Sequence, residues 1–349
     1  MKNGRLLWPD ILKIISILGV ILIHCSAPML VSEPLGGKSW WLANIYDSMV
    51  RWCVPVFFMV SGAFIIEKAG SPSPGQFFLK RSQKIVVPFI IWSALYFLWR
   101  IHKGENLKWL NFPAMLLEEP IYYHLWFIYV LIGLYIIAPV LGAYVKGASR
   151  KNQSYLLFLW FITASLLPML QNCCKFHTFF FPVETVSVLK FSGYFFLGYF
   201  LRDTKPKAAL MPVFFLLYAI GFLITTFGTY YLSLKTGNES ISELLYEYYT
   251  VNVLAMSVSV YLIVKSIPFP LLSSTKSPIA VTAACVPGVY FVHAFVIAVF
   301  KQGLLGFTFS ERSLTPAIGI PVFTLAVFTV SLLITQILRL IPVLKCSIP

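Results

Sequence analysis

Charge is scarce in this chain of 349 residues: charged residues make up 11% of it, whereas hydrophobic residues make up 58%. Acidic residues are the scarcer sign, with 13 Asp and Glu against 27 Lys and Arg. A soluble domain carries about 25% charged residues and is about half apolar, so the composition excludes an ordinary soluble fold. It is typical of a polytopic membrane protein.

Cysteine is also sparse, and the six cysteines include no C-x-x-C pair and no zinc spacing, so we expect no metal site. Cys173 and Cys174 are expected to lie outside the cell together, but a bridge between adjacent residues is strained, and we expect no structural disulfide there. The sequence lacks repeats, low-complexity tracts and any long soluble stretch. We therefore expect a single domain over residues 1–349.

Long apolar runs make up the rest, and the first of them, residues 11–30, lacks the Ala-x-Ala-like site of a cleaved signal peptide. We interpret it as a retained transmembrane helix. A window of about 20 residues predicts an all-α bundle of about ten spans. The spans are expected at residues 10–30, 42–66, 84–101, 122–144, 154–170, 187–201, 209–233, 248–266, 280–300 and 315–341. The sixth is short for a bilayer of about 30 Å, so we expect a half-length or tilted element.

The basic residues of the short loops predict the orientation, because Lys and Arg are enriched on the cytoplasmic side. With the amino terminus inside, sixteen basic residues fall in cytoplasmic segments and nine in outer segments. Both termini are therefore predicted to be cytoplasmic. The net charge of +14 is then an insertion signal that also attracts anionic membrane lipids. We expect no nucleic-acid partner.

Ionisable residues inside predicted spans are costly and point to function. Lys13 and His24 are eleven residues apart, which is about 20° beyond three helical turns, so they share a face and lie about 16 Å apart along the axis. Taken alone, Lys13 could equally be an interfacial lysine. His24 alone could equally be a histidine of the bundle that is hydrogen-bonded to a neighbouring helix. Together they favour a line of polar groups along a cavity.

The second predicted span contains Asp47 and Arg51, whose spacing of four residues lets them pair on one helix face. The pair is either purely structural or belongs to the acceptor side of a site. Ser61 and the neighbouring Gly62 would suit a cavity wall, and they are also ordinary in membrane helices. We group Asp47, Arg51 and Ser61, together with His124 of the fourth predicted span, as structural or acceptor-side residues.

The third predicted span opens with a basic group that includes Arg81 and Lys84, three residues apart and on one face. We expect them at a helix amino terminus, whose dipole favours anions, so they are candidates for binding phosphate. The same charges could simply anchor the span on the cytoplasmic side.

Two further histidines stand in aromatic segments, His124 at the outer end of the fourth span and His293 well inside the ninth. Histidine is the side chain best suited to move a proton near neutral pH. Three histidines could also bind a metal, but their spacing matches no ligand motif.

Six segments of this sequence occur in an order that resembles the acyltransferase type 3 family of bacterial integral membrane acyltransferases. The similarity covers nearly the whole chain and is strongest to short members of the enterobacterial common antigen O-acetyltransferase kind, which carry no attached soluble domain. The six segments are WPDILKIISILGVILIH, VPVFFMVSGAFII, KRSQKIVVPFIIW, YHLWFIYVLIGLYIIAPVL, GYFFLGYFL and VYFVHAFVI.

The resemblance implies a basic residue separated by ten residues from an essential histidine, and a basic pair opening the third helix. These features fall on Lys13 with His24, and on Arg81 with Lys84. The family more often has arginine at both basic places. Lysine keeps the charge but loses the bidentate fork of arginine for phosphate.

The resemblance also implies the substrates. The donor would be acetyl-coenzyme A or a related acyl thioester that enters from the cytoplasm as a substrate, with no permanently bound cofactor. The acceptor would be a hydroxyl of a cell-surface glycan or its lipid-linked precursor, on the far side of the bacterial inner membrane or within the bilayer. Lys13, Arg81 and Lys84 would bind the donor phosphates.

For the chemistry, His24 would act as general base on the acceptor hydroxyl or would itself be acylated first. His293, Tyr290 and His124 could orient the base or donate to the thioester oxygen. A transporter or flippase for a glycan is the alternative, because a line of polar groups is equally a permeation path. The sequence shows no paired halves of the kind typical of transporters. A third hypothesis is a binding or assembly role without catalysis. The presence of all four motif residues disfavours it: Lys13, His24, Arg81 and Lys84.

Overall fold

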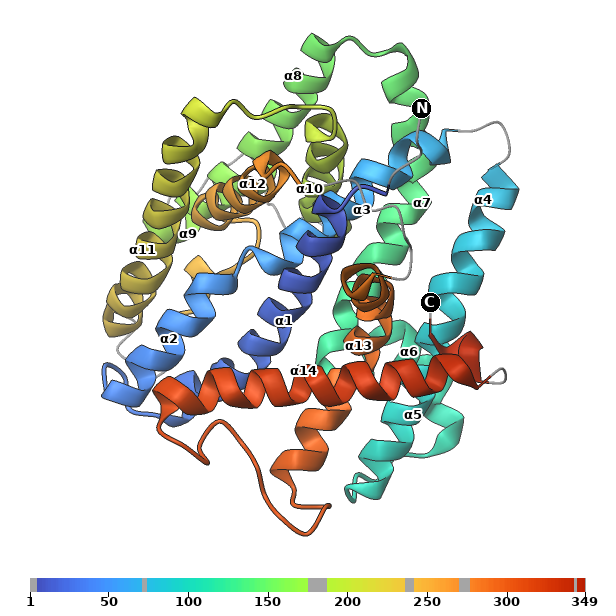
Figure 1. Ribbon diagram of the computed structural model, residues 1–349, viewed down its shortest axis with the longest axis vertical. Helices are drawn as coiled ribbons and strands as arrows, with labels where there is room; N and C mark the ends of the chain where they lie inside the picture. The colour runs from blue at the N-terminus through green and yellow to red at the C-terminus, as the bar shows by residue number, and fades with distance from the viewer. Residues whose placement is uncertain are drawn as a thin grey trace.

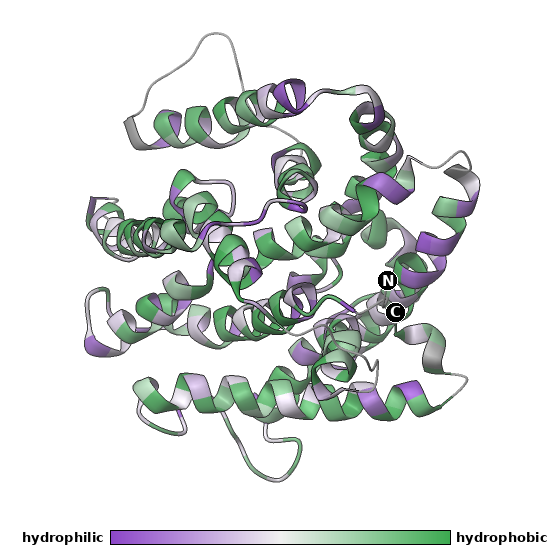
Figure 2. Cartoon of the chain, turned by 45° about the horizontal axis from the view of Figure 1, so that its top comes forward, coloured by the Kyte–Doolittle hydropathy of each residue, from purple (hydrophilic) through white to green (hydrophobic). Residues whose placement is uncertain are grey.

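The structure is a computed structural model, and its described residues form helices and connecting loops with no β-strand (Figure 1). The described residues are 5–70, 74–174, 187–235, 242–269, 277–341 and 344–348. The helices are apolar along most of their length (Figure 2), as is required where each spanning segment must satisfy its own backbone groups in lipid. The predicted all-α membrane bundle is confirmed.

The α-helices, in chain order, are α1 (Trp8–Ser32), α2 (Lys38–Val50), α3 (Cys53–Ala69), α4 (Pro74–Arg81), α5 (Val87–His102), α6 (Phe112–Glu118), α7 (Trp126–Gly147), α8 (Arg150–Trp160), α9 (Leu167–Cys174), α10 (Ser187–Leu201), α11 (Met211–Lys235), α12 (Val251–Ser266), α13 (Pro278–Lys301) and α14 (Pro316–Leu340). Two wider π-turns, η1 (Ser82–Val86) and η4 (Phe161–Leu166), join α4 to α5 and α8 to α9. Short 3₁₀ turns are η2 (Trp109–Asn111), η3 (Tyr123–Leu125), η5 (Ala208–Leu210), η6 (Leu244–Tyr246) and η7 (Leu344–Ser347).

Nine helical segments of the described chain are long and apolar enough to cross a membrane. The sixth predicted span is the exception, because α10 has only 15 residues. At 1.5 Å per residue it is roughly 22 Å long, shorter than a hydrocarbon core of about 30 Å. The expectation of a short element at this place is confirmed. The side chains of Cys173 and Cys174 lie outside the described residues.

Contacts between helix ends agree with the predicted alternation of spans. At one end of the bundle, Lys265 at the end of α12 donates a hydrogen bond of 2.5 Å to the Leu201 carbonyl at the end of α10. At the other end, Arg312 before α14 pairs at 2.8 Å with Glu33 after α1. We call these the inner and outer ends, after the predicted orientation.

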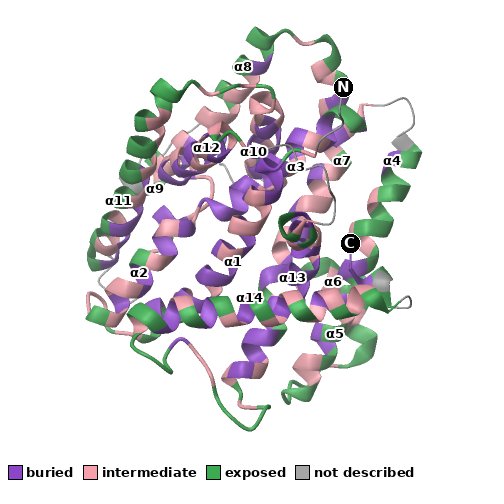
Figure 3. Ribbon diagram, viewed as in Figure 1, coloured by how far each residue is buried: buried purple, intermediate pink, exposed green. Residues whose placement is uncertain are grey.

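Burial separates the core helices from those that face lipid. α1, α3 and α13 lie at the centre of the bundle and are mostly buried, whereas α11 lies at its edge and is largely exposed (Figure 3). Phe215 and Phe227 of α11 are more than half exposed, at 56% and 57%. In a bilayer such side chains meet lipid tails, which are as apolar as leucine.

The short α10 packs tightly on α3 because glycines remove the side chains between them. A Cβ atom at Gly62 would lie 1.7 Å from the Phe195 carbonyl oxygen, and one at Gly198 would lie 1.8 Å from that of Met59. No side chain fits in such a contact. The two glycines therefore set the distance between the helices, as small residues commonly do in membrane bundles.

The second predicted span is not one helix, because α2 and α3 are separated at Arg51 and Trp52. Pro55 explains the break: it has no N–H to donate to the Arg51 carbonyl, four residues earlier. The break leaves Arg51 at a corner in the middle of the span.

The third predicted span begins earlier than expected. Helical structure starts at Pro74 and runs through the π-turn η1 into α5, so Arg81 and Lys84 lie inside a long helical segment. The expectation that they sit at a helix amino terminus is wrong, and the helix dipole does not account for anion binding there. Pro88 gives a physical reason for the wide turn, because its ring would clash with the Lys84 carbonyl in a regular α-helix.

Candidate active site

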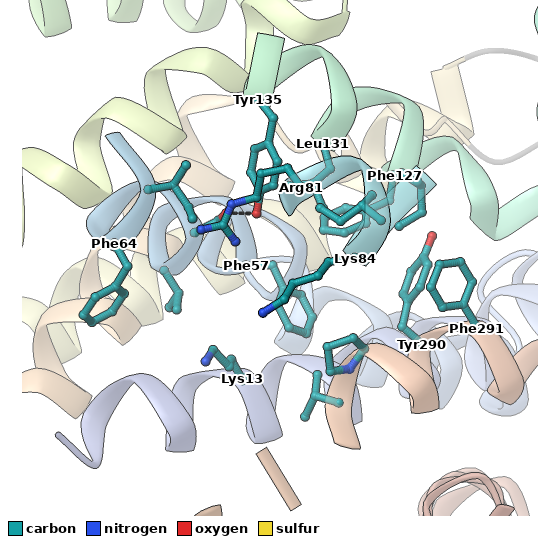
Figure 4. Close-up of a pocket in the computed structure, with 17 residues that line it drawn as sticks. Lys13, Phe57, Phe64, Arg81, Lys84, Phe127, Leu131, Tyr135, Tyr290 and Phe291 are labelled. Atoms are coloured by element: carbon teal, nitrogen blue, oxygen red, sulfur yellow. Dashed lines mark hydrogen bonds between the residues drawn. The ribbon is translucent and has the colours of Figure 1, made fainter. Parts of the chain in front are cut away.

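Three cations from different elements meet in a cavity of about 440 Å³, which we call the inner cavity. Lys13 comes from α1, Arg81 from the end of α4 and Lys84 from η1, and their charged groups point into the same space (Figure 4). The deep end of the inner cavity is lined by aromatic side chains, among them Phe57, Phe127 and Tyr290. The expectation that Lys13 shares a site with the basic pair of the third span agrees with this geometry.

The three cations differ in how far protein acids neutralise them. The Lys13 Nζ atom lies 3.7 Å from Oδ1 of Asp10. The Asp10 carboxylate pairs more closely with Arg5, whose Nε lies 2.6 Å from Oδ2. Arg81 and Lys84 have no ion pair with any described residue. The Nε atom of Arg81 is buried and has no hydrogen-bond partner in the described chain. A buried donor without a partner calls for an explanation, and a bound anion supplies one.

Ser61 also lines the inner cavity, where its hydroxyl lies 3.0 Å from the Tyr135 hydroxyl. It therefore belongs to the side of the three cations. Of the two roles expected for Ser61, structural or acceptor-side, the structural one agrees with this hydrogen bond, whereas Arg51 lines a different space. The hydrogen bond of Ser61 to α7 holds the wall of the inner cavity.

A second, much smaller cavity of about 30 Å³ adjoins the inner cavity, and we call it the histidine chamber because His24 and His124 line it. Phe57, Phe127 and Tyr290 line both spaces. A volume of this size holds about one water molecule, or one reacting group of that size. Lys13 and His24 thus open onto adjoining spaces, as their spacing predicts.

The ring of His24 is held by packing alone. It stacks on His293, with ring centroids 5.3 Å apart and an interplanar angle of 21°, and meets the edge of Tyr123 at 4.9 Å. No hydrogen bond to the His24 ring occurs within the described residues, and the side chain is half-buried. Its nitrogens are therefore available to a reactant in the histidine chamber.

His293 is fixed by hydrogen bonds from its own helix. Its Nδ1 lies 2.6 Å from the Tyr290 carbonyl oxygen, which can only accept, so Nδ1 carries the proton. The Tyr96 hydroxyl donates to the Phe291 carbonyl at 2.7 Å and accepts from the Phe295 N–H at 3.1 Å. It thus bridges two groups that pair with each other in a regular helix, and this inserted hydroxyl sets the local path of α13 around His293.

His124 is like His24 in that its ring makes no hydrogen bond within the described residues. It is 2% exposed, and neither ring nitrogen has a partner in the described chain. Its ring lies among those of Tyr96, Tyr290 and His293, at centroid distances of 5.1, 5.4 and 5.0 Å. In the neutral ring one nitrogen is a donor, so His124, which lines the histidine chamber, carries an N–H that no described residue uses.

The Tyr290 hydroxyl donates a short hydrogen bond to the His124 carbonyl oxygen. Its proton is engaged by the backbone, so Tyr290 positions His124 and is not an open donor for a thioester oxygen. That part of the sequence-based interpretation does not fit the geometry.

A third space of about 370 Å³ lies on the outer side, and we call it the outer pocket. It adjoins the histidine chamber because Trp126 and Tyr248 line both. Arg51 projects into it from the corner between α2 and α3, and the predicted ion pair of Arg51 with Asp47 is confirmed. Asp47 is fully buried and also accepts a hydrogen bond of 3.2 Å from Ser26.

Half of the residues that line the outer pocket come from a segment that our sequence reasoning missed, residues 243–249. Its sequence, ELLYEYY, interleaves carboxylates with tyrosines just before α12. Aromatic and acidic residues together in a connecting segment are a signal for binding polar ligands, and this signal was available in the sequence. No group of His, Cys, Asp and Glu in the described part of the chain is arranged to hold a metal ion.

A family model described as "Acyltransferase domain" matches residues 6–336 of the chain. No curated protein and no solved structure matches the chain. The matched range contains the cations of the inner cavity, the three histidines and the outer pocket. With its nine long apolar helices among the described residues, the chain is a multi-pass membrane protein that belongs to the acyltransferase type 3 family.

Proposed function

We propose that the protein is a membrane O-acyltransferase that moves an acetyl or similar acyl group from cytoplasmic acyl-coenzyme A to a hydroxyl of a cell-surface glycan or its lipid-linked precursor. Its place would be the bacterial inner membrane. The observation that carries the proposal is the position of His24, in a small chamber that adjoins the cationic inner cavity on one side and the outer pocket on the other.

The inner cavity suits the donor. Coenzyme A has a phosphate-bearing nucleotide end and a long neutral arm that ends in the thioester. Arg81 and Lys84 carry charges that no described acid neutralises, and charge-assisted hydrogen bonds to phosphate are strong. The apolar remainder of the inner cavity suits the arm, which would bring the thioester to the deep end near Tyr290. Acyl-coenzyme A is a substrate in this scheme, and no permanently bound cofactor takes part.

In the proposed reaction, His24 takes the proton of the acceptor hydroxyl as general base. The hydroxyl oxygen forms a bond to the thioester carbonyl carbon, and the resulting oxyanion accepts a hydrogen bond from the unused N–H of His124. The C–S bond then breaks, and the coenzyme A thiolate leaves with the proton that His24 received. Atoms and charges balance without a further reactant.

Direct transfer is favoured over an acylated histidine because the histidine chamber adjoins a larger space on each side. Both reactants could reach His24 at once, and holding them together supplies a large part of the rate. His293 would act as a positioning residue, since its ring stacks on His24 while its Nδ1 is engaged by the backbone.

The proposal is tested with membranes that contain the protein, acetyl-coenzyme A labelled in the acetyl group, and surface glycan from the same cells. We expect free coenzyme A thiol to appear together with label in the glycan fraction, and mass spectrometry of glycans from a deletion strain to show a missing acetyl increment. Glycan movement across the membrane without thiol release would overturn the proposal and establish the transporter alternative.

A further inference from the structure

The outer pocket carries charges of both signs in equal number among its described residues. Arg51 and Lys190 are positive, and Glu243 and Glu247 are negative. Asp47 already neutralises Arg51, so the charge left for a ligand is not positive. Neither Glu243 nor Glu247 takes part in an ion pair within the described chain. The outer pocket therefore presents open carboxylates, which accept hydrogen bonds from hydroxyl groups.

Aromatic rings form the rest of its wall. Trp126 stacks on Tyr248 with centroids 5.8 Å apart and an angle of 23°, and lies 5.7 Å from Phe191. Tyr246 is covered by the Arg51 guanidinium at 4.0 Å, and Tyr249 by the Lys190 ammonium at 4.2 Å. Aromatic faces next to carboxylates suit a ligand that has both apolar C–H faces and hydroxyl groups.

The hydrogen-bonding groups at the boundary with the histidine chamber are open. Neither the Trp126 indole N–H nor the Tyr248 hydroxyl has a hydrogen-bond partner among the described residues, and neither atom is sealed from solvent. Both residues also line the chamber of His24. A ligand in the outer pocket would thus meet two free polar groups at the point nearest to the base.

We propose that the outer pocket binds the acceptor as an uncharged sugar unit, with ring faces against Trp126 and Tyr248 and hydroxyl groups bonded to Glu247. This inference rests on the proposed acyltransferase function and adds the class of acceptor that the site selects. Its volume of about 370 Å³ lies within the range of about 300–1,000 Å³ usual for ligand pockets. An acidic sugar is disfavoured because its carboxylate would face Glu243 and Glu247.

The test measures binding of two small probes to the full chain in lipid nanodiscs by saturation-transfer NMR. The probes are methyl N-acetyl-β-glucosaminide, which is uncharged, and methyl β-glucuronide, which is anionic. We expect the uncharged probe to bind at least about fivefold more tightly, because like charges repel the other. Glu247→Gln should weaken binding of the uncharged probe about tenfold, the usual effect of losing a hydrogen bond to a charged group, and should narrow the difference between the probes.

Trp126→Leu should weaken binding of both probes because it removes the stacking face. Tyr248→Phe keeps the ring and removes only the hydroxyl. Glu118→Gln is the matched control, because Glu118 is exposed on α6 and lines none of the three spaces. Equal or tighter binding of methyl β-glucuronide would overturn the inference. So would unchanged binding of the uncharged probe in both Glu247→Gln and Trp126→Leu, or no binding of either probe.

Acetyl-coenzyme A binding to the same nanodiscs separates this inference from the proposed function. If acetyl-coenzyme A binds and the uncharged probe does not, the acceptor site is wrong and the donor site stands. If the uncharged probe binds as expected and acetyl-coenzyme A does not, the sugar site stands and the acyltransferase proposal fails.

Discussion

The inner cavity and the outer pocket are similar in size, about 440 and 370 Å³, but opposite in chemistry. Lys13, Arg81 and Lys84 line the first, and none of its described lining residues is acidic. The second is lined by two cations, by two carboxylates that form no ion pair within the described chain, and by aromatic rings. Two spaces of one chemistry, on either side of the histidine chamber, would suit a single solute that passes through. Two with different chemistries suit two different reactants, which is the demand of a transferase.

The histidine chamber lies between these two spaces and shares lining residues with each of them. It is too small for a substrate, and it is lined by His24 and His124, whose ring nitrogens have no hydrogen-bond partner among the described residues. A substitution that changes one of the three spaces should therefore leave the roles of the other two intact.

Changing His24 to Gln should have the largest effect, because it removes the base while leaving both larger spaces intact. Acyl transfer should fall by about two to four orders of magnitude, with unchanged binding of labelled acetyl-coenzyme A. His102→Gln serves as the control, since His102 is exposed at the outer end of α5. Near-normal glycan acylation in the His24 variant would end its assignment as the base and would return it to a packing role.

Changing His124 to Phe should lower the rate of transfer by about 10²–10³-fold, the usual effect of removing one donor to an oxyanion. The Michaelis constant for acetyl-coenzyme A should change little, because the phosphates bind elsewhere. His124→Gln retains an N–H group and should recover part of the rate. If Phe and Gln behave alike, the His124 ring serves packing and not oxyanion stabilisation.

Arg81→Gln and Lys84→Gln should each raise the dissociation constant of acetyl-coenzyme A by roughly tenfold or more, since each removes a charge-assisted contact with phosphate. Lys80→Gln is the matched control: it removes an equal charge from an exposed residue of α4 that does not line the inner cavity. An equal loss in the Lys80 variant would show a general effect of positive charge at the membrane surface.

Asp10→Asn should have the smallest effect on acetyl-coenzyme A binding, and it should strengthen binding where the Arg81 and Lys84 variants weaken it. Asp10 lies 3.7 Å from Lys13 and draws part of its charge away from the inner cavity. Its neutralisation should tighten acetyl-coenzyme A binding about two- to fivefold, as expected for a partly exposed ion pair. Isothermal titration at low salt would measure the change. Weaker binding would mean that Asp10 holds Lys13 in the position that the donor requires.

The sequence could predict those parts of the site that lie on one helix. Lys13 with His24 and Asp47 with Arg51 follow from helical spacing, and the apolar runs give the bundle itself. The meeting of His24, His124 and His293 depends on how α1, η3 and α13 pack, which spacing along one helix does not determine. The early start of the third span was missed because residues 74–83 are too polar for a hydropathy window although they form helix.

The outer pocket could not be predicted from spacing along one helix either. Its residues come from the corner at Arg51, the start of α7, the start of α10 and the segment 243–249, which are far apart in sequence. Only the interleaved carboxylates and tyrosines of that segment could have been noticed. Their relation to His24 follows from Trp126 and Tyr248, which line both the outer pocket and the histidine chamber. Trp126 stands in the segment YHLWFIYVLIGLYIIAPVL, but nothing in that segment shows that it meets residues 243–249.

The central claim is that donor and acceptor approach His24 from opposite ends of the bundle. It is tested most directly in proteoliposomes whose orientation is sorted by protease access to a carboxy-terminal tag, with labelled acetyl-coenzyme A and surface glycan supplied on chosen sides. We expect transfer only when acetyl-coenzyme A is on the side of Lys84 and the carboxy terminus, and the glycan is on the side of Glu247. Transfer that requires both reactants on the same side would contradict the account.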